Sequence, residues 1–261
     1  VLNAVDYPHA MRLEIAEGLT LEGIHAFAGN LYQRAFVEAL VHGNISAEDA
    51  VGMTRTLRKT LGIEPVAWED TFAQAYLSQP EGEALYRVDR LKVNNSCFWR
   101  EYRLGATTPR NRAVGLVLEN FLHRPFFTEM RTNQQLGYIV WAGDMTRRDN
   151  TYLYFIIQSG DYAADVMEDR AAAFIAGYPE MFRGLPPETF AAFKAAGVEK
   201  LKEKQKSIAE WGGKLNREAF EFEADFARDE KVLEVLETLS QEAAAAMLER
   251  VLSAEGRQLR T

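Results

Sequence analysis

Apolar residues recur every three or four positions in several segments of the chain, which is the spacing of one face of an α-helix. Thr20 and Ser46 are of the residue types that cap helix N-termini, and each precedes such a segment. The predicted helices are Leu19–Arg34, the segment from Ser46 to Leu61, the segment opened by Thr108 and Pro109, Val166–Phe182, the segment opened by Pro186 and Pro187, Val232–Leu239 and Gln241–Leu252. Phe220, Phe222 and Phe226 are predicted to be core residues.

Ala35–Val41 is predicted to be a short strand. Alternating apolar and polar residues predict four further β-strands. These four strands are Ala84–Leu91, Ser96–Leu104, Tyr138–Met145 and Thr151–Gln158. A turn at Asn94–Asn95 joins the first two, and the last two form a hairpin around Arg147–Asn150. Strands, a helix, a hairpin and then several helices follow one another along the chain. This order predicts an α+β fold of two layers, in which a mostly antiparallel sheet has helices packed on one face.

The segment Pro125–Val140 connects the third predicted helix to the hairpin. Pro125 suits the first position of a new short helix, because its missing N–H costs nothing there. Gly137 can end that helix with a positive φ angle. Arg131 then lies near the helix end and Tyr138 enters the sheet. A turn between a helix end and a strand start can direct the Arg131 guanidinium group and the Tyr138 phenol toward the same group of a bound molecule.

Composition narrows the range of partners. The chain of 261 residues has a formal net charge of -8 and a pI near 5.2, which argues against nucleic acid and anionic membrane surfaces. No run of about 20 apolar residues predicts a membrane span, so we expect a soluble protein, cytoplasmic or periplasmic. Cys97 is the only cysteine, which excludes an internal disulfide, and we expect it to be a small core residue.

The histidines lack the spacing of a catalytic zinc site, which needs about three protein ligands and an open position. The four histidines are His9, His25, His42 and His123. No two of them lie within five residues of each other, and neither H-x-x-E-H nor H-E-x-x-H occurs. We therefore expect no metal ligand and no cofactor site in this segment, and we interpret His42 and His123 as polar residues at element boundaries.

The stretch Phe126–Val140 resembles the C-terminal, non-catalytic half of the insulinase–pitrilysin zinc metallopeptidases, also called inverzincins. The resemblance continues in Tyr154–Gly160 and is supported by Ala39–Ser46 and Asn94–Cys97, which follow in the family's order. It implies the same α+β fold. It also implies that residues 1–35 are the helical tail of a third domain and that residues 36–261 form the fourth, inactive domain.

The resemblance implies a role for two side chains. Arg131 and Tyr138 match family positions that reach from the C-terminal half into the zinc site of the N-terminal half. The Arg131 fork would hydrogen-bond a substrate carbonyl or carboxylate, and the Tyr138 hydroxyl would donate to the developing oxyanion. Zinc would be held by the complementary half, and the substrates would be peptides. Asn133 and Gln134 replace residues that are often charged in relatives.

Other functions remain open on the sequence. The chain begins with Val1 rather than Met, which suggests a piece of a longer polypeptide. A separately encoded partner subunit of a zinc-carrying protein, or a peptide-binding module, would have the same sequence features. A scaffold without any substrate contact is a third alternative.

Overall fold

The computed structural model describes residues 7, 9–71, 84–86, 93–147, 149–253, 256 and 258–260. For residues 84–86 and 258–260 it describes only the backbone. The chain forms two compact units, one of residues 1–78 with 206–216 and the other of residues 79–205 with 217–261. The boundary that the family resemblance places after residue 35 stays a prediction.

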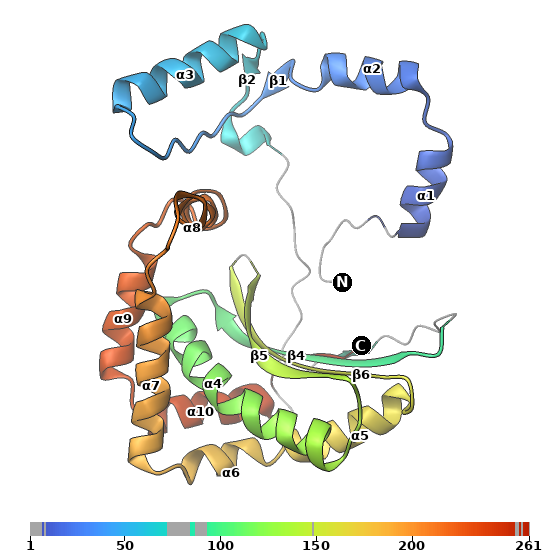
Figure 1. Ribbon diagram of the computed structural model, residues 1–261, viewed down its shortest axis with the longest axis vertical. Coiled ribbons are helices and arrows are strands. Elements are labelled where there is room, and N and C mark those ends of the chain that lie inside the picture. Colours follow the sequence, from blue (N-terminus) through green and yellow to red (C-terminus); the bar gives the residue numbers. More distant parts are fainter. Residues whose placement is uncertain are drawn as a thin grey trace. The chain divides into compact units, whose positions relative to one another are not determined.

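The first unit is built mainly from helices with capped ends (Figure 1). Its elements are α1 (His9–Glu17), α2 (Leu21–Asn30), β1 (Arg34–Ala35), α3 (Ala47–Thr60), β2 (Glu64–Pro65) and the 3-10 turn η1 (Trp68–Asp70). The strands β1 and β2 pair in parallel. The predicted strand Ala35–Val41 is wrong, since the strand ends at Ala35 and residues 36–41 have no regular structure. The hydroxyl of Thr20 accepts from Gly23 N at 3.1 Å and that of Ser46 from Asp49 N at 3.1 Å, so both predicted N-caps are confirmed. Helix α8 (Ile208–Glu221) contributes its residues up to 216 to this unit.

The second unit contains a five-stranded sheet in the order β3-β7-β4-β6-β5. Its strands are β3 (Ala84–Tyr86), β4 (Ser96–Ala106), β5 (Ile139–Arg147), β6 (Asn150–Ser159) and β7 (Gln258–Arg260). Among the described strands of this sheet, β3 and β7 pair in parallel and the other pairings are antiparallel. The predicted hairpin is confirmed, since Arg147 pairs with Asn150 across the turn from β5 to β6.

The neighbour of β4 differs from the prediction. The turn at Asn94–Asn95 was expected to join two adjacent strands, but β7 lies between β3 and β4. The strand β7 has three residues, which are too few to show an alternating pattern. It pairs with segments about 155 or more positions away in sequence, and a local sequence pattern cannot predict such a pairing. The part of the predicted strand at residues 87–91 lies outside the described residues.

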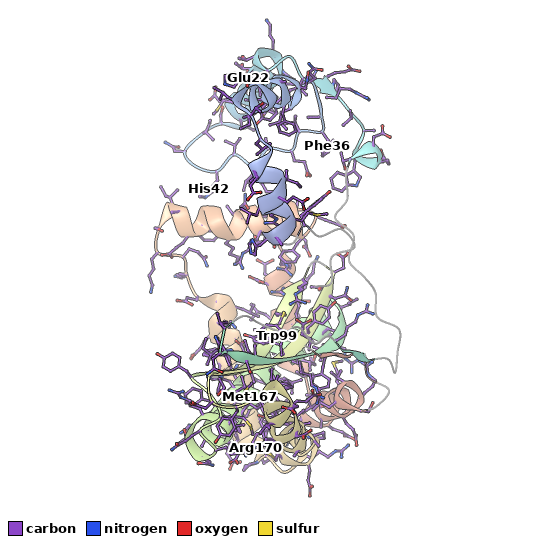
Figure 2. All side chains as sticks on the ribbon, turned by 90° about the vertical axis from the view of Figure 1, so that its right-hand side faces the viewer. Glu22, Phe36, His42, Trp99, Met167 and Arg170 are labelled. Atoms are coloured by element: carbon purple, nitrogen blue, oxygen red, sulfur yellow. The ribbon has the colours of Figure 1, made fainter. Side chains whose placement is uncertain are left out.

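The helices of the second unit lie on one face of its sheet, as the sequence predicted (Figure 1). They are α4 (Pro109–Phe127), the π-helical turn η2 (Thr128–Asn133), α5 (Ala164–Ile175), α6 (Tyr178–Arg183), α7 (Pro187–Lys202), α9 (Arg228–Thr238) and α10 (Gln241–Leu252). Figure 2 shows the two layers: Trp99 lies on the sheet, while Met167 and Arg170 lie on α5. The α+β fold of two layers is therefore confirmed.

The core lies between α4 and the helix-facing side of the sheet. Helix α4 buries nine residues, among them Val114, Leu118 and Phe121. From the sheet, Leu153 and Phe155 on β6 are fully buried against the helical layer. The burial of these large apolar side chains, each contributing about 1.5–3 kcal/mol, is the main source of stability for this unit.

Three sequence predictions fail in the helical layer and in β4. The segment Val166–Phe182 forms two helices rather than one, because Pro179 has no N–H for the carbonyl of Ile175 and its ring crowds that carbonyl. Cys97 is exposed rather than in the core, since its neighbour Phe98 takes the buried side of the strand. Its partial burial nevertheless raises the pKa of the thiol.

The predicted phenylalanine core is also wrong. Phe220 and Phe226 are 43% and 49% exposed, and the ring of Phe222 packs under Arg228 at 3.3 Å. Glu223 and Ala224 have positive φ angles. The resulting turn breaks the helical spacing on which the prediction rested.

The buried hydroxyl of Tyr178 donates to the carbonyl of Leu122 at 2.8 Å and so links α6 to α4. Tyr178→Phe should lower the free energy of unfolding by about 1 kcal/mol, because this buried bond is lost. Urea unfolding of the full chain measures the change. Tyr138→Phe is the control, since that ring is 82% exposed and its loss of a hydroxyl should change stability by less than about 0.5 kcal/mol. Equal losses in both variants would contradict this assignment.

Candidate functional site

The site begins where α4 ends. Pro125 lies inside α4 and does not open a new helix, so the sequence prediction is wrong there. Because proline has no N–H, the carbonyl of Phe121 receives no bond from it, and the chain soon widens into η2. In η2 the N–H of Gln134 reaches the carbonyl of Glu129 at 3.0 Å, five residues back instead of four. Thr108 caps the other end of α4, as predicted.

The turn from η2 into β5 uses a positive φ angle at an unexpected position. Gln135 has a φ of 53°, whereas Gly137 is not among the residues with positive φ. Gly137 is required for a different reason. A Cβ atom at Gly137 would lie 2.2 Å from the carbonyl oxygen of Gln158 on β6. The glycine therefore allows close approach of two backbones, and the next N–H, that of Tyr138, donates to the same Gln158 oxygen at 3.0 Å.

Arg131 and Tyr138 lie against each other at this corner. The guanidinium carbon of Arg131 is 4.9 Å from the centre of the Tyr138 ring, a cation–π geometry. Arg131 also donates from Nη1 to the carbonyl of Gly137. The Tyr138 ring is 82% exposed, and its hydroxyl has no hydrogen-bond partner among the described residues. The structure thus brings the two predicted site residues together and leaves the phenol open to solvent.

A polar bridge stabilises the turn that carries Arg131. The carboxylate of Glu129 accepts from Asn133 Nδ2 at 2.7 Å and from Gln134 Nε2 at 2.9 Å. These two bonds lower the pKa of Glu129, because they favour its charged form. The side-chain amides of Asn133 and Gln134 therefore have a local structural role. The four-residue spacing of Glu129 and Asn133 in a helical turn was the available sequence signal, and the sequence analysis missed it.

His123 lies among aromatic rings close to the turn that carries Arg131. The ring of His123 on α4 lies 3.9 Å from Trp141 on β5 and 6.0 Å from Phe127. Its Nδ1 atom is buried and has no partner within the described part of the chain. His42 is exposed, in the other unit (Figure 2). Among the described residues, no group of three or more His, Cys, Asp or Glu side chains could hold a metal ion.

Comparison with known proteins finds relatives over nearly the whole chain. Residues 117–215 match the family described as PQQ synthase PqqF-like, C-terminal lobe domain 4. The A-factor-processing enzyme of Saccharomyces cerevisiae is 23% identical over 260 residues, which cover 98% of this chain and 25% of that protein. The insulin-degrading enzyme of Homo sapiens is 27% identical over 241 residues, which cover 88% of this chain and 23% of that protein. The chain thus spans about a quarter of the length of these curated relatives.

Solved structures share the fold. Pitrilysin superposes with a TM-score of 0.85 at 20% identity, over 98% of this chain and 27% of pitrilysin. The peptidase M16 inactive domain from Pseudomonas fluorescens gives 0.63 at 15% identity, over 93% of this chain and 57% of that one. The fold is therefore that of a pitrilysin-type peptidase domain. The resemblance to the insulinase–pitrilysin family that was seen in the sequence is therefore confirmed.

No helix in the described ranges is long and apolar enough to cross a membrane.

Gly137→Ala tests the close approach of the site turn to β6. The added methyl group would collide with the Gln158 carbonyl, so we expect a loss of about 2 kcal/mol in the free energy of unfolding. Gly160→Ala is the matched control just after β6, because its Cβ would meet only Asn94 O at an ordinary 3.7 Å. The control should leave stability unchanged or raise it by up to about 1 kcal/mol. Chemical unfolding measures both, and a neutral Gly137→Ala would contradict the role given to this glycine.

Proposed function

We propose that the chain is the non-catalytic C-terminal half of a zinc-dependent metalloendopeptidase, in which Arg131 and Tyr138 contact a peptide held at the zinc site of the N-terminal half. The observation that supports this most directly is the exposed Tyr138 phenol stacked on Arg131. Because the ring lies beside Arg131 and its hydroxyl is exposed, the phenol can donate to a group outside this chain. The fold shared with pitrilysin is consistent with this role.

Arg131 is suited to bind the backbone of a peptide. One of its five N–H donors goes to the Gly137 carbonyl, and the remaining donors have no partner among the described residues. The Tyr138 ring and the Gly137 carbonyl together fix the plane of the guanidinium group. A fixed planar fork can donate two parallel bonds to a carbonyl or carboxylate of the substrate at small entropic cost.

Tyr138 is suited to stabilise negative charge that develops on the peptide. Its hydroxyl is free to donate, and the cation beside the ring favours an anion nearby. One such donor, aimed at the oxygen of a tetrahedral intermediate, is typically worth about 3 kcal/mol. The zinc ion of the complementary half would supply the activated water for this reaction. This half would close over the peptide and reduce its contact with bulk water.

Tyr138→Phe in the complete enzyme separates catalysis from folding. The variant keeps the ring and its contact with Arg131 but removes the hydroxyl, so we expect kcat to fall about a hundredfold with a small change in KM. Arg131→Lys removes the fork and should lower kcat/KM about tenfold. Steady-state cleavage of a quenched fluorescent peptide measures both.

A second arginine–tyrosine pair provides the control. Arg170 on α5 lies 5.2 Å from the ring of Tyr162, which resembles the geometry at the site (Figure 2 labels Arg170). Tyr162→Phe and Arg170→Lys should leave turnover within about twofold of the unsubstituted enzyme. If the site variants were as active as these controls, the proposed roles of Arg131 and Tyr138 would be wrong, and a scaffold role would be favoured.

The isolated chain should not cleave peptides with or without added zinc. The reason is that its histidines lack the spacing of the family's zinc motif. Addition of the complementary N-terminal half should restore cleavage, whether that half is normally part of the same chain or a partner subunit. Zinc-dependent cleavage by the purified chain alone would overturn the proposal.

A further inference from the structure

The carboxylate of Glu129 binds two side chains of the turn that carries Arg131. Its Oε2 atom accepts from Asn133 Nδ2 at 2.7 Å, and its Oε1 atom accepts from Gln134 Nε2 at 2.9 Å. Asn133 is four residues after the carboxylate and Gln134 is five residues after it. The two spacings have different structural requirements, because residues four positions apart meet in any α-helix, whereas residues five positions apart do not.

The bond between Glu129 and Gln134 fits the π-helical turn and not an α-helical one. Each residue of an α-helix turns by about 100°, so a residue five positions later lies about 140° around the axis, on another side of the helix. In η2 the backbone N–H of Gln134 donates to the carbonyl of Glu129 at 3.0 Å, five residues back. This wider turn places the fifth residue beside the first. The side-chain bond therefore favours the wider form of the turn.

The width of the turn decides how Arg131 meets Tyr138. The turn closes with a bond from the N–H of Leu136 to the carbonyl of Met130 at 2.8 Å. Arg131 lies inside the turn, and Tyr138 lies just beyond it. A change to an α-helical turn would rotate the later residues by roughly 100° relative to Arg131. The distance of 4.9 Å between the guanidinium carbon and the tyrosine ring therefore depends on the wider turn.

The two amides also leave Arg131 available. A carboxylate two residues from an arginine can form an ion pair with it, but each oxygen of Glu129 accepts from an amide instead. The described side chains of Glu129 and Arg131 form no ion pair with each other. An ion pair there would occupy N–H donors of Arg131 that a peptide could otherwise receive.

We propose that Glu129 and Gln134 are positioning residues, whose bond keeps the turn in its π-helical form and so holds Arg131 against Tyr138 with its remaining donors open to a peptide. Neither side chain touches the substrate in this arrangement, and their effect passes through Arg131. The consequence for cleavage rests on the proposed function, whereas the geometry of the turn is testable without it.

Two substitutions of opposite charge test the bond in the full 261-residue chain. Gln134→Lys keeps a donor for the carboxylate, whereas Gln134→Glu places a second, repelling carboxylate beside Glu129. Proton NMR should show the Arg131 side-chain protons shifted upfield by the Tyr138 ring. This shift should persist in Gln134→Lys and be lost in Gln134→Glu, in which amide exchange at Leu136 should be about tenfold faster.

Gln33→Glu is the matched control for the NMR test. The amide of Gln33 donates to Asn30 Oδ1 at 2.6 Å in the other unit, so this substitution should leave the Arg131 signals unchanged. Unchanged Arg131 signals and unchanged Leu136 exchange in Gln134→Glu would overturn the proposal. Loss of the upfield shift in Gln134→Lys as well would also overturn it, because the restored donor would then have no effect.

Turnover of the complete enzyme tests the consequence for cleavage. Gln134→Glu should lower kcat/KM about tenfold, because a misplaced contact group reduces the rate, and Gln134→Lys should stay within about threefold of the unsubstituted enzyme. Loss of the upfield shift without loss of turnover would leave the positioning of Arg131 standing and would refute its proposed role in cleavage. The failure of this inference and the failure of the proposed function therefore give different results.

Discussion

The packing of α4 against the sheet is the interaction on which the other features of the second unit depend. The helix buries Ala113–Leu118, Phe121 and Leu122, and Phe126 and Met130 extend the buried face past Pro125 into η2. Because that face is fixed on the core, the exit from the helix is fixed as well. The direction in which Arg131 leaves the turn therefore depends on the burial of apolar residues in α4.

Features set by neighbouring residues in sequence were predictable, and features set by distant contacts were not. The caps at Thr20, Ser46 and Thr108 and the hairpin at Arg147–Asn150 depend only on local hydrogen bonding, and the sequence identified each of them. The requirement for glycine at position 137 comes from the carbonyl of a strand that follows later in the chain. A local sequence pattern cannot show that the backbone at Gly137 lies close to the carbonyl of Gln158. The sequence analysis therefore singled out Gly137 for a positive φ angle that it does not have.

The candidate site likewise combines features that the sequence predicted with features that depend on distant contacts. The resemblance to the family supplied Arg131 and Tyr138, but not their stacking, which depends on the π-helical turn between them. The hydrogen bond between Glu129 and Asn133 could have been predicted from the sequence, because residues four positions apart face each other in a helical turn.

The place of β7 in the sheet has a consequence for synthesis. Its three residues lie between β3 and β4, although the ribosome makes them after every other strand of the sheet. Until they emerge, the β7-facing edge of β4 has unpaired N–H and C=O groups, and β3 has no neighbour. The nascent domain therefore passes through a stage with an open edge, which other extended chains can join. Chaperone binding during translation would be most useful in that interval, before the last strand closes the sheet.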